Sequence, residues 1–114
     1  MLIGAHVVLY STDASADAAV LDAWLPGSTV DAGGEWLIMA LPPAEAACHP
    51  VDGPPSHELF LMTDDLQTEV RTLAELGVTC SAVETPQWGS PVRVLLPSGA
   101  QLGLYQPRHA TTVR

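Results

Sequence analysis

Basic residues are scarce in this sequence of 114 residues. It has four Lys or Arg residues and 13 Asp or Glu residues, which gives a formal net charge of −9. A nucleic-acid backbone would be repelled by that field, so we expect no nucleic-acid partner. No apolar run approaches the roughly 20 residues that a helix needs to cross a bilayer, so we expect no membrane association. Met1–Gly4 lacks the basic flank and the apolar segment of a secretion signal, which predicts a cytoplasmic protein.

Catalytic and redox motifs are absent as well. The two cysteines, Cys48 and Cys80, lack CxxC spacing, and we predict that both are reduced, small, buried residues. No GxSxG sequence supports a hydrolase, and Gly33-Gly34 is only a two-glycine turn, not a phosphate-cradling loop. Hydrolysis and phosphate binding are therefore poorly supported.

The apolar content, by contrast, is sufficient for a folded core. Hydrophobic residues make up 47% of the sequence, which is enough for one ordinary domain. The clearest pattern lies in Ser56–Val78, where an apolar run of strand length precedes Thr63–Asp65, whose side chains can cap a helix. The helix predicted next has one apolar stripe and ends at Gly77. That stripe consists of Leu66, Val70, Leu73 and Leu76.

The first half of the chain has a similar order of elements. Ala5–Tyr10 is rich in strand-forming residues, and the cap-type residues after it lead into a helix predicted over Ala14–Leu25. The side of this helix that we expect to be buried carries Ala16, Ala19, Val20, Ala23 and Trp24. Three further strands are predicted over Thr29–Asp31, Glu35–Leu41 and Glu45–His49.

A weak internal repeat relates the two halves. His57 lies 51 residues after His6, and the same offset carries Leu25 onto Leu76. The second half continues with strands predicted over Thr79–Val83, Val92–Leu96 and Gln101–Tyr105. Each half is therefore predicted as a strand, a helix and three strands, with module 1 over about residues 4–50 and module 2 over about residues 56–107.

The repeated βαβββ order, the histidine that opens each first strand, and two segments of the second half point to a known family. HELFLMTDDLQTEVRTLAELGV and the ending LPSGAQLGLYQP resemble the vicinal oxygen chelate superfamily. That superfamily includes glyoxalase I, extradiol dioxygenases, and the bleomycin and fosfomycin resistance proteins. The resemblance covers essentially the whole chain as a single domain, residues 1–114. It implies an α+β fold in which two βαβββ modules form a cup-shaped mixed β-sheet with the helices outside, together with a homodimer.

Strand alternation predicts which side chains face the cup. In the last strand the cup-facing residues are Gln101, Gly103 and Tyr105, with Leu102 and Leu104 packed under the helices. In the two first strands the same alternation turns six side chains inward and Glu58 away from the cup. The six are His6, Val8, Tyr10, His57, Leu59 and Leu61.

The resemblance also implies a metal site, built from one position on the first and last strand of each module. The first-strand positions match as His6 and His57, but the last-strand positions fall on Ala46 and Gly103, which cannot ligate a metal. The site for Zn, Ni, Fe or Mn is therefore incomplete. Either the two histidines bind a divalent metal, or they are hydrogen-bonded cavity residues and the protein has no cofactor.

Aromatic residues complete the predicted ligand-binding cup. Trp36, Trp88 and Tyr105 are expected to border it, and such rings suit an apolar or planar ligand. Trp88 lies in a loop flanked by prolines and is predicted to form a wall or a lid. Arg93 either makes a surface ion pair or guides an anionic ligand into the cup. Tyr10 and Gln101 are the other residues of the predicted ligand-binding set.

Taken with the missing carboxylate, the pattern predicts a protein that binds a small molecule in its cup, of a sequestering or resistance kind, with a partial metal site. The alternative is a metal-dependent lyase, isomerase or dioxygenase, in which a divalent metal polarises a pair of substrate oxygens. A third alternative is a structural or regulatory dimer with a vestigial cup. No catalytic residue is assigned.

Overall fold

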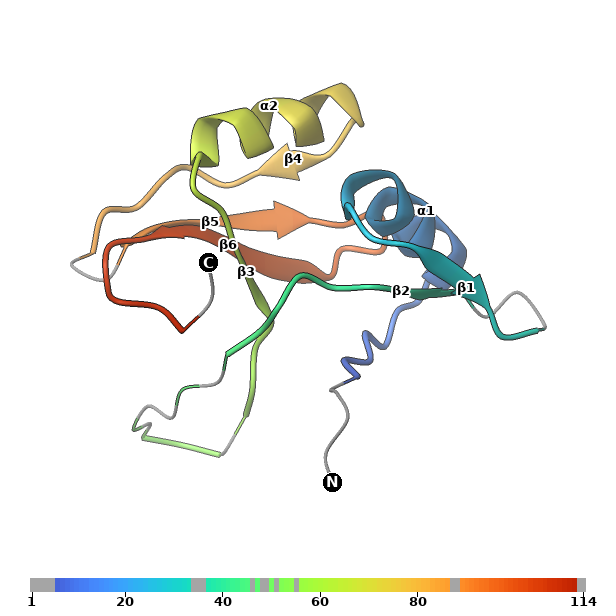
Figure 1. The fold of residues 1–114 in the computed structure, drawn as a ribbon, viewed down its shortest axis with the longest axis horizontal. Helices are drawn as coiled ribbons and strands as arrows, with labels where there is room; N and C mark the ends of the chain where they lie inside the picture. The colour runs from blue at the N-terminus through green and yellow to red at the C-terminus, as the bar shows by residue number, and fades with distance from the viewer. Residues whose placement is uncertain are drawn as a thin grey trace.

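The computed structural model describes residues 6–33, 37–45, 47, 50, 52–54, 56–86 and 89–112 (Figure 1). It has two helices and two sheets, so the predicted α+β class is confirmed. In chain order the elements are α1 (Ala14–Trp24), β1 (Thr29–Asp31), β2 (Leu37–Met39), β3 (Phe60–Met62), α2 (Leu66–Glu75), β4 (Thr79–Cys80), β5 (Gly89–Leu95) and β6 (Gln101–Pro107).

The larger sheet has four strands in the order β3-β6-β5-β4. Strand β3 runs parallel to β6, and the other neighbouring strands are antiparallel. The second half of the chain therefore has the predicted order of a strand, a helix and three strands. In Figure 1 helix α2 lies above this sheet, and the hairpin of β1 and β2 forms a separate two-stranded sheet.

One core lies between the helices and one face of the four-stranded sheet. Leu21 of α1 and Leu66 and Leu73 of α2 meet the sheet there, and Leu73 is fully buried. Burying a side chain of this size contributes about 1.5–3 kcal/mol relative to leaving it exposed. The sheet and the loops beside it contribute Val78, Val92, Val94, Leu96, Leu102 and Leu104.

Helix α2 follows the sequence prediction closely. Asp65 caps it by accepting a hydrogen bond from the backbone N–H of Thr68 at 3.2 Å. Within the predicted stripe, Leu66 and Leu73 are buried, whereas Leu76, at the end of the helix, is 40% exposed. Gly77 ends the helix with a φ of +78°, a backbone conformation that glycine adopts more readily than other residues.

Helix α1 has the predicted position, but its predicted buried side is wrong in part. Ala19 and Ala23 are exposed, and the buried residues are Asp17 and Leu21. The physical reason is the carboxylate of Asp17, which accepts hydrogen bonds from the backbone N–H and the hydroxyl of Ser98, at 2.9 and 2.7 Å. These bonds fasten α1 to the turn between β5 and β6 and set which face of the helix meets the core.

The first half departs from the prediction in its strands. Residues 6–10 form no strand, so the strand predicted over Ala5–Tyr10 is wrong for the part that the structure describes. Val7, Val8 and Tyr10 are 44%, 57% and 91% exposed. A strand is stable only when a neighbour pairs with it, so β-propensity without a partner strand does not produce one here. For the strand predicted over Glu45–His49, residues 45 and 47 lie in no strand, and residues 46, 48 and 49 lie outside the described part.

Four strands also begin or end at residues other than those predicted. β2 and β4 are shorter than predicted, while β5 begins at Gly89 and β6 extends to Pro107. Cys80, at the end of β4, is free and half-buried, and burial raises the pKa of its thiol. Cys48 lies outside the described residues.

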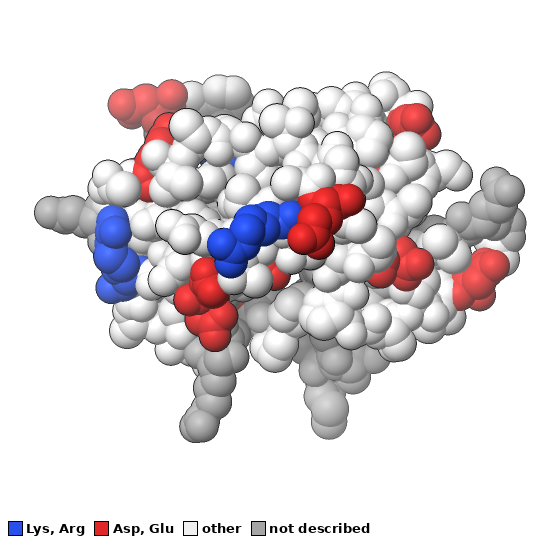
Figure 2. Space-filling view, turned by 90° about the horizontal axis from the view of Figure 1, so that it is seen from above, with Lys and Arg blue, Asp and Glu red and all other residues white. Residues whose placement is uncertain are grey.

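Charged side chains are scattered over the face of the molecule that Figure 2 shows. Figure 2 views the side on which α2 lies, and acidic side chains are scattered there with few basic ones beside them. No helix in the described part of the chain is both long enough and apolar enough to span a bilayer.

Candidate ligand-binding site

The strand pairing of β5 and β6 separates the two faces of the larger sheet. Leu102 pairs with Val94 and Leu104 with Val92, and all four belong to the core under the helices. Arg93 pairs with Gly103 and Pro91 with Tyr105, so these residues lie on the opposite face. We call this opposite face, which carries Arg93, Gly103 and Tyr105, the helix-free face. The predicted alternation of the last strand is therefore confirmed.

The alternation predicted for the strand after His57 is wrong. Phe60 pairs with Gly103, which places Phe60 on the helix-free face, and Leu59 and Leu61 pack against the core instead. Glu58 is also on the helix-free side, where its carboxylate meets Arg93. The prediction counted alternation from His57, but the register with β6 and the burial of the two leucines decide the face.

Gly103 makes room for the aromatic ring of its neighbour. A Cβ atom at this position would overlap the ring of Phe60, so the absence of a side chain lets that ring lie against β6. The rings of Phe60 and Tyr105 then meet edge to face, with centroids 5.6 Å apart and planes at 87°. The family resemblance implies a metal ligand on the last strand at Gly103, and an aromatic ring fills the space there.

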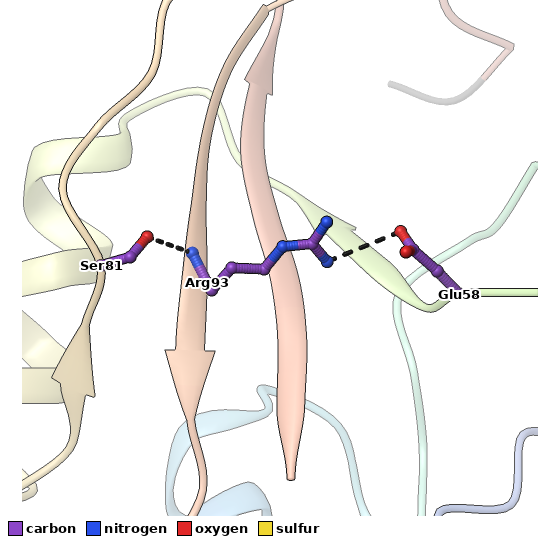
Figure 3. Close-up of polar contacts among 3 residues, drawn as sticks. All are labelled: Glu58, Ser81 and Arg93. Atoms are coloured by element: carbon purple, nitrogen blue, oxygen red, sulfur yellow. Dashed lines mark hydrogen bonds and ion pairs between the residues drawn. The ribbon is translucent and has the colours of Figure 1, made fainter.

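Arg93 reaches across β6 toward the start of β3. Figure 3 shows its side chain extending from β5 over the neighbouring strand to Glu58. The guanidinium carbon lies 5.0 Å from the centroid of the Phe60 ring, and Nη1 lies 3.5 Å from Oε2 of Glu58. The backbone N–H of Arg93 donates to the hydroxyl of Ser81 at 2.8 Å, which fixes the start of the side chain. The predicted surface ion pair is present, and it lies beside an aromatic ring.

A cavity of about 480 Å³ opens next to this ion pair. Its apolar part comes from three leucines, all of which belong to the core or pack against it. The rest of the lining carries hydrogen-bonding and charged groups. Polar groups contribute more of this lining than the leucines do, and convergent polar groups beside apolar side chains in a concave site can orient a small ligand. The lining residues are Leu9, His57, Glu58, Leu59, Arg93, Gln101 and Leu102.

The far end of the helix-free face is covered by the C-terminal segment. The hydroxyl of Tyr105 lies 2.9 Å from Nε2 of His109, and Nδ1 of that histidine lies 2.8 Å from the carbonyl oxygen of Ala110. A carbonyl can only accept, so Nδ1 carries the proton, and in the neutral ring Nε2 accepts from Tyr105. Burial, followed by the nearby carboxylate of Glu45, raises the pKa of the Tyr105 hydroxyl.

Glu45 fastens the same segment. Its Oε2 accepts hydrogen bonds from the backbone N–H and the hydroxyl of Thr112, at 2.8 and 2.7 Å, and these bonds lower the pKa of the carboxyl. Tyr105 is consequently 9% exposed and is not open to a ligand in this arrangement.

The structure brings three of the predicted site residues together. His57, Arg93 and Gln101 line the cavity, and Tyr105 lies on the same face beneath the C-terminal segment. Tyr10 is 91% exposed, and it is its neighbour Leu9 that borders the cavity. His6 is exposed as well. Trp36 and Trp88 lie outside the described residues.

Three residues that line the cavity, Leu9, Leu102 and Glu58, were missed from the sequence, as was Phe60, which contacts Arg93. The sequence held a signal for Glu58 and Phe60. Leu59 and Leu61 are apolar at alternate positions in front of an amphipathic helix, which favours the core for those two leucines and the other face for their neighbours.

Within the described ranges, no three His, Cys, Asp or Glu side chains lie close enough together to hold a metal ion. The described residues therefore do not fit a metal held by three protein ligands, and Gly103 is covered by Phe60. Metal binding by His6 and His57 stays a prediction.

A second, smaller hollow of about 280 Å³ lies beside α2. It is almost entirely apolar and lies away from the Arg93 ion pair. Its lining residues are Leu66, Gln67, Val70, Arg71 and Val83.

No protein-family model matches the sequence, and no curated protein matches it. Two solved structures match the fold over nearly the whole chain. The crystal structure of TnmS3, an antibiotic binding protein from Streptomyces sp. CB03234, has a TM-score of 0.63 and 25% identity, over 94% of this chain and 99% of that one. An integron cassette protein from the mobile metagenome of V. cholerae has a TM-score of 0.54 and 18% identity, over 93% and 97%. The chain shares an α+β fold with these proteins.

Proposed function

We propose that this chain is a small-molecule-binding protein of the vicinal oxygen chelate type, with a sequestering or resistance role in the cytoplasm. The observation that carries the proposal is the cavity of about 480 Å³ at Arg93, where leucine side chains lie beside convergent hydrogen-bonding and charged groups. The likeness to TnmS3, which is described as an antibiotic binding protein, supports it at 25% identity over nearly the full length of both chains.

The residues that line the cavity favour ligand binding over catalysis. Leu9, Leu59 and Leu102 supply the apolar contact that drives a ligand out of water. Gln101 and His57 can donate and accept hydrogen bonds, which would orient the ligand. No observation among the described residues favours the metal-enzyme alternative, so binding is the function that we propose.

The test uses N-phenyl-1-naphthylamine, a neutral aromatic dye that becomes fluorescent in apolar surroundings. We expect saturable binding to the wild-type protein and several-fold weaker binding to Leu9→Ser, because that change removes part of the apolar wall. Val7→Ser is the matched control, since Val7 is in the same segment but does not line the cavity. No saturable binding, or equal weakening by both variants, would contradict the proposal.

We also infer that the protein is a homodimer. The segment 6–10 is apolar, largely exposed and in no strand, and β3 and β4 each pair on one side only within the described sheet. A second copy can cover such edges and side chains. Light scattering at high micromolar concentration should give the mass of two chains, and the mass of one chain would refute this inference.

Metal binding is a conditional part of the proposal. If His6 and His57 are ligands, Zn²⁺, Ni²⁺ or Fe²⁺ should raise the melting temperature, and His57→Ala should abolish the gain. A ligand that binds only the folded state adds about 2.7 kcal/mol at 100 times its Kd. No shift with any of the three metals would leave both residues as cavity histidines without a metal.

A further inference from the structure

We propose that the ligand of this cavity is a planar aromatic anion, and that Glu58 occupies the place of the ligand's acidic group on Arg93 in the free protein. The inference rests on the proposed function, because it names the class of ligand for the same cavity. It follows from the way in which Arg93 is held and from the weakness of its ion pair.

Arg93 is fixed at its backbone and loosely paired at its tip. Its N–H donates to the hydroxyl of Ser81, and its carbonyl accepts from the N–H of Ser81, both at 2.8 Å. The guanidinium, in contrast, meets Glu58 through one nitrogen–oxygen distance of 3.5 Å. Strong charge-assisted hydrogen bonds of this kind measure about 2.7–2.9 Å and are often bidentate. The guanidinium is therefore positioned for an acidic group that binds it better than Glu58 does.

The Glu58 ion pair is easily replaced. The side chains of Arg93 and Glu58 are 44% and 56% exposed, and ion pairs between exposed groups contribute only about 0–1 kcal/mol. Leu59 anchors the chain at the next position by packing against the core. The Glu58 side chain can thus turn away to solvent while the backbone and the cavity wall stay in place.

The aromatic preference comes from the ring beside the guanidinium. Phe60 packs against Gly103 with the Arg93 guanidinium over its ring, so an acidic group bound at Arg93 would hold the rest of the ligand close to this ring and against the leucines that line the cavity. Aromatic pairs favour offset or edge-to-face contacts with such a ring. An aryl carboxylate, sulfonate or phenolate combines an acidic group for Arg93 with an aromatic ring directly attached to it.

The negative charge elsewhere on the protein makes Arg93 a preferred position for an anion. The net charge is −9, so anions are repelled from most of the surface. Arg93 is the basic residue among those that line the cavity. Arg71 lies on α2 beside the smaller hollow, and Arg108 donates to the carbonyl oxygens of Pro86 and Gly89.

The test compares two dyes that share one skeleton. Anilinonaphthalene sulfonate is N-phenyl-1-naphthylamine with an added sulfonate, so the ratio of their Kd values isolates the acidic group. In Glu58→Gln, which removes the competing charge, we expect the ratio of the sulfonate-dye Kd to the neutral-dye Kd to fall about fivefold. In Arg93→Gln we expect the same ratio to rise about tenfold.

Matched variants control for net charge and for folding. Glu75→Gln and Arg71→Gln, both on α2, make the same changes in charge away from the cavity and should leave the ratio of Kd values unchanged. Arg93→Lys keeps the charge but loses the planar fork, and should retain part of the preference for the sulfonate dye. Melting curves establish that each variant is folded at the temperature of the titration.

Two results would overturn the inference without touching the proposed function. One is equal strengthening of sulfonate binding by Glu58→Gln and Glu75→Gln, which would assign the effect to net charge. The other is an unchanged Kd ratio in Arg93→Gln while the neutral dye still binds. Failure of both dyes to bind wild-type protein saturably would overturn the proposed function together with the inference.

Discussion

The two faces of the four-stranded sheet differ in what holds them together. The face under the helices is closed by aliphatic side chains, of which Leu73 and Val94 are fully buried. The helix-free face instead carries Arg93, Phe60 and Tyr105, joined by ring contacts, one ion pair and a hydrogen bond to the C-terminal segment. Stability is therefore concentrated on one face, and the other is left with groups that can exchange partners.

The largest effect should come from the face under the helices. Leu73→Ala should lower the free energy of unfolding by about 2–5 kcal/mol, because it removes a fully buried side chain and leaves a cavity. Leu76→Ala, at the residue that directly follows this helix and is 40% exposed, is the matched control and should cost less than about 1 kcal/mol. Urea titrations measure both values. Similar losses for the two variants would show that α2 does not pack as described.

A smaller effect is expected where α1 meets the sheet. Asp17→Asn should lower the free energy of unfolding by about 1–3 kcal/mol at neutral pH, since it weakens the bonds from Ser98 and replaces a charged acceptor. Burial raises the pKa of the Asp17 carboxyl, but the hydrogen bonds of Ser98 and Ser11 outweigh that and hold the pKa below its ordinary value.

The lowered pKa also fixes the sign of the pH dependence. A carboxyl with a lower pKa in the folded state stabilises the fold above its unfolded pKa of about 3.9, and that contribution is lost as the pH falls through the folded value. The cost of Asp17→Asn should therefore shrink as the pH is lowered toward 3, in urea titrations repeated across that range. A constant cost at every pH would argue against an ionised Asp17 in the folded protein.

On the helix-free face, Gly103→Ala should cost about 1–3 kcal/mol, because the new methyl group overlaps the ring of Phe60. Gly103→Glu, which would add the carboxylate that a last-strand metal ligand requires, meets the same ring. Combining Gly103→Ala with Phe60→Ala should recover part of the loss, so the two changes should not be additive. Additive costs in a double-mutant cycle would show that the ring does not lie against Gly103.

Local sequence patterns explain what the sequence predicted well. Helix α2, its cap at Asp65 and its end at Gly77 follow from local patterns, as does the burial of Leu102 and Leu104. These features depend on neighbours within a few residues, so periodicity and cap chemistry determine them.

The errors arose where distant residues decide the outcome. The face of Phe60 depends on its register with Gly103, and the buried side of α1 depends on the bonds between Asp17 and Ser98. Likewise, residues 6–10 have strand-forming side chains but no partner strand in the described part. Glu58 and Phe60, which contact the Arg93 guanidinium, were missed because alternation was counted from His57, whereas the apolar positions Leu59 and Leu61 favoured the opposite assignment.

The location of a bound ligand tests the account most directly. Nuclear Overhauser contacts between N-phenyl-1-naphthylamine and the protein would identify the side chains that the dye touches. The cavity beside the Arg93–Glu58 ion pair predicts contacts to Leu9, to Leu59 and to the side chain of Arg93. Contacts to Val70 and Val83, which line the smaller hollow beside α2, would place the ligand elsewhere and contradict the assignment of the binding site.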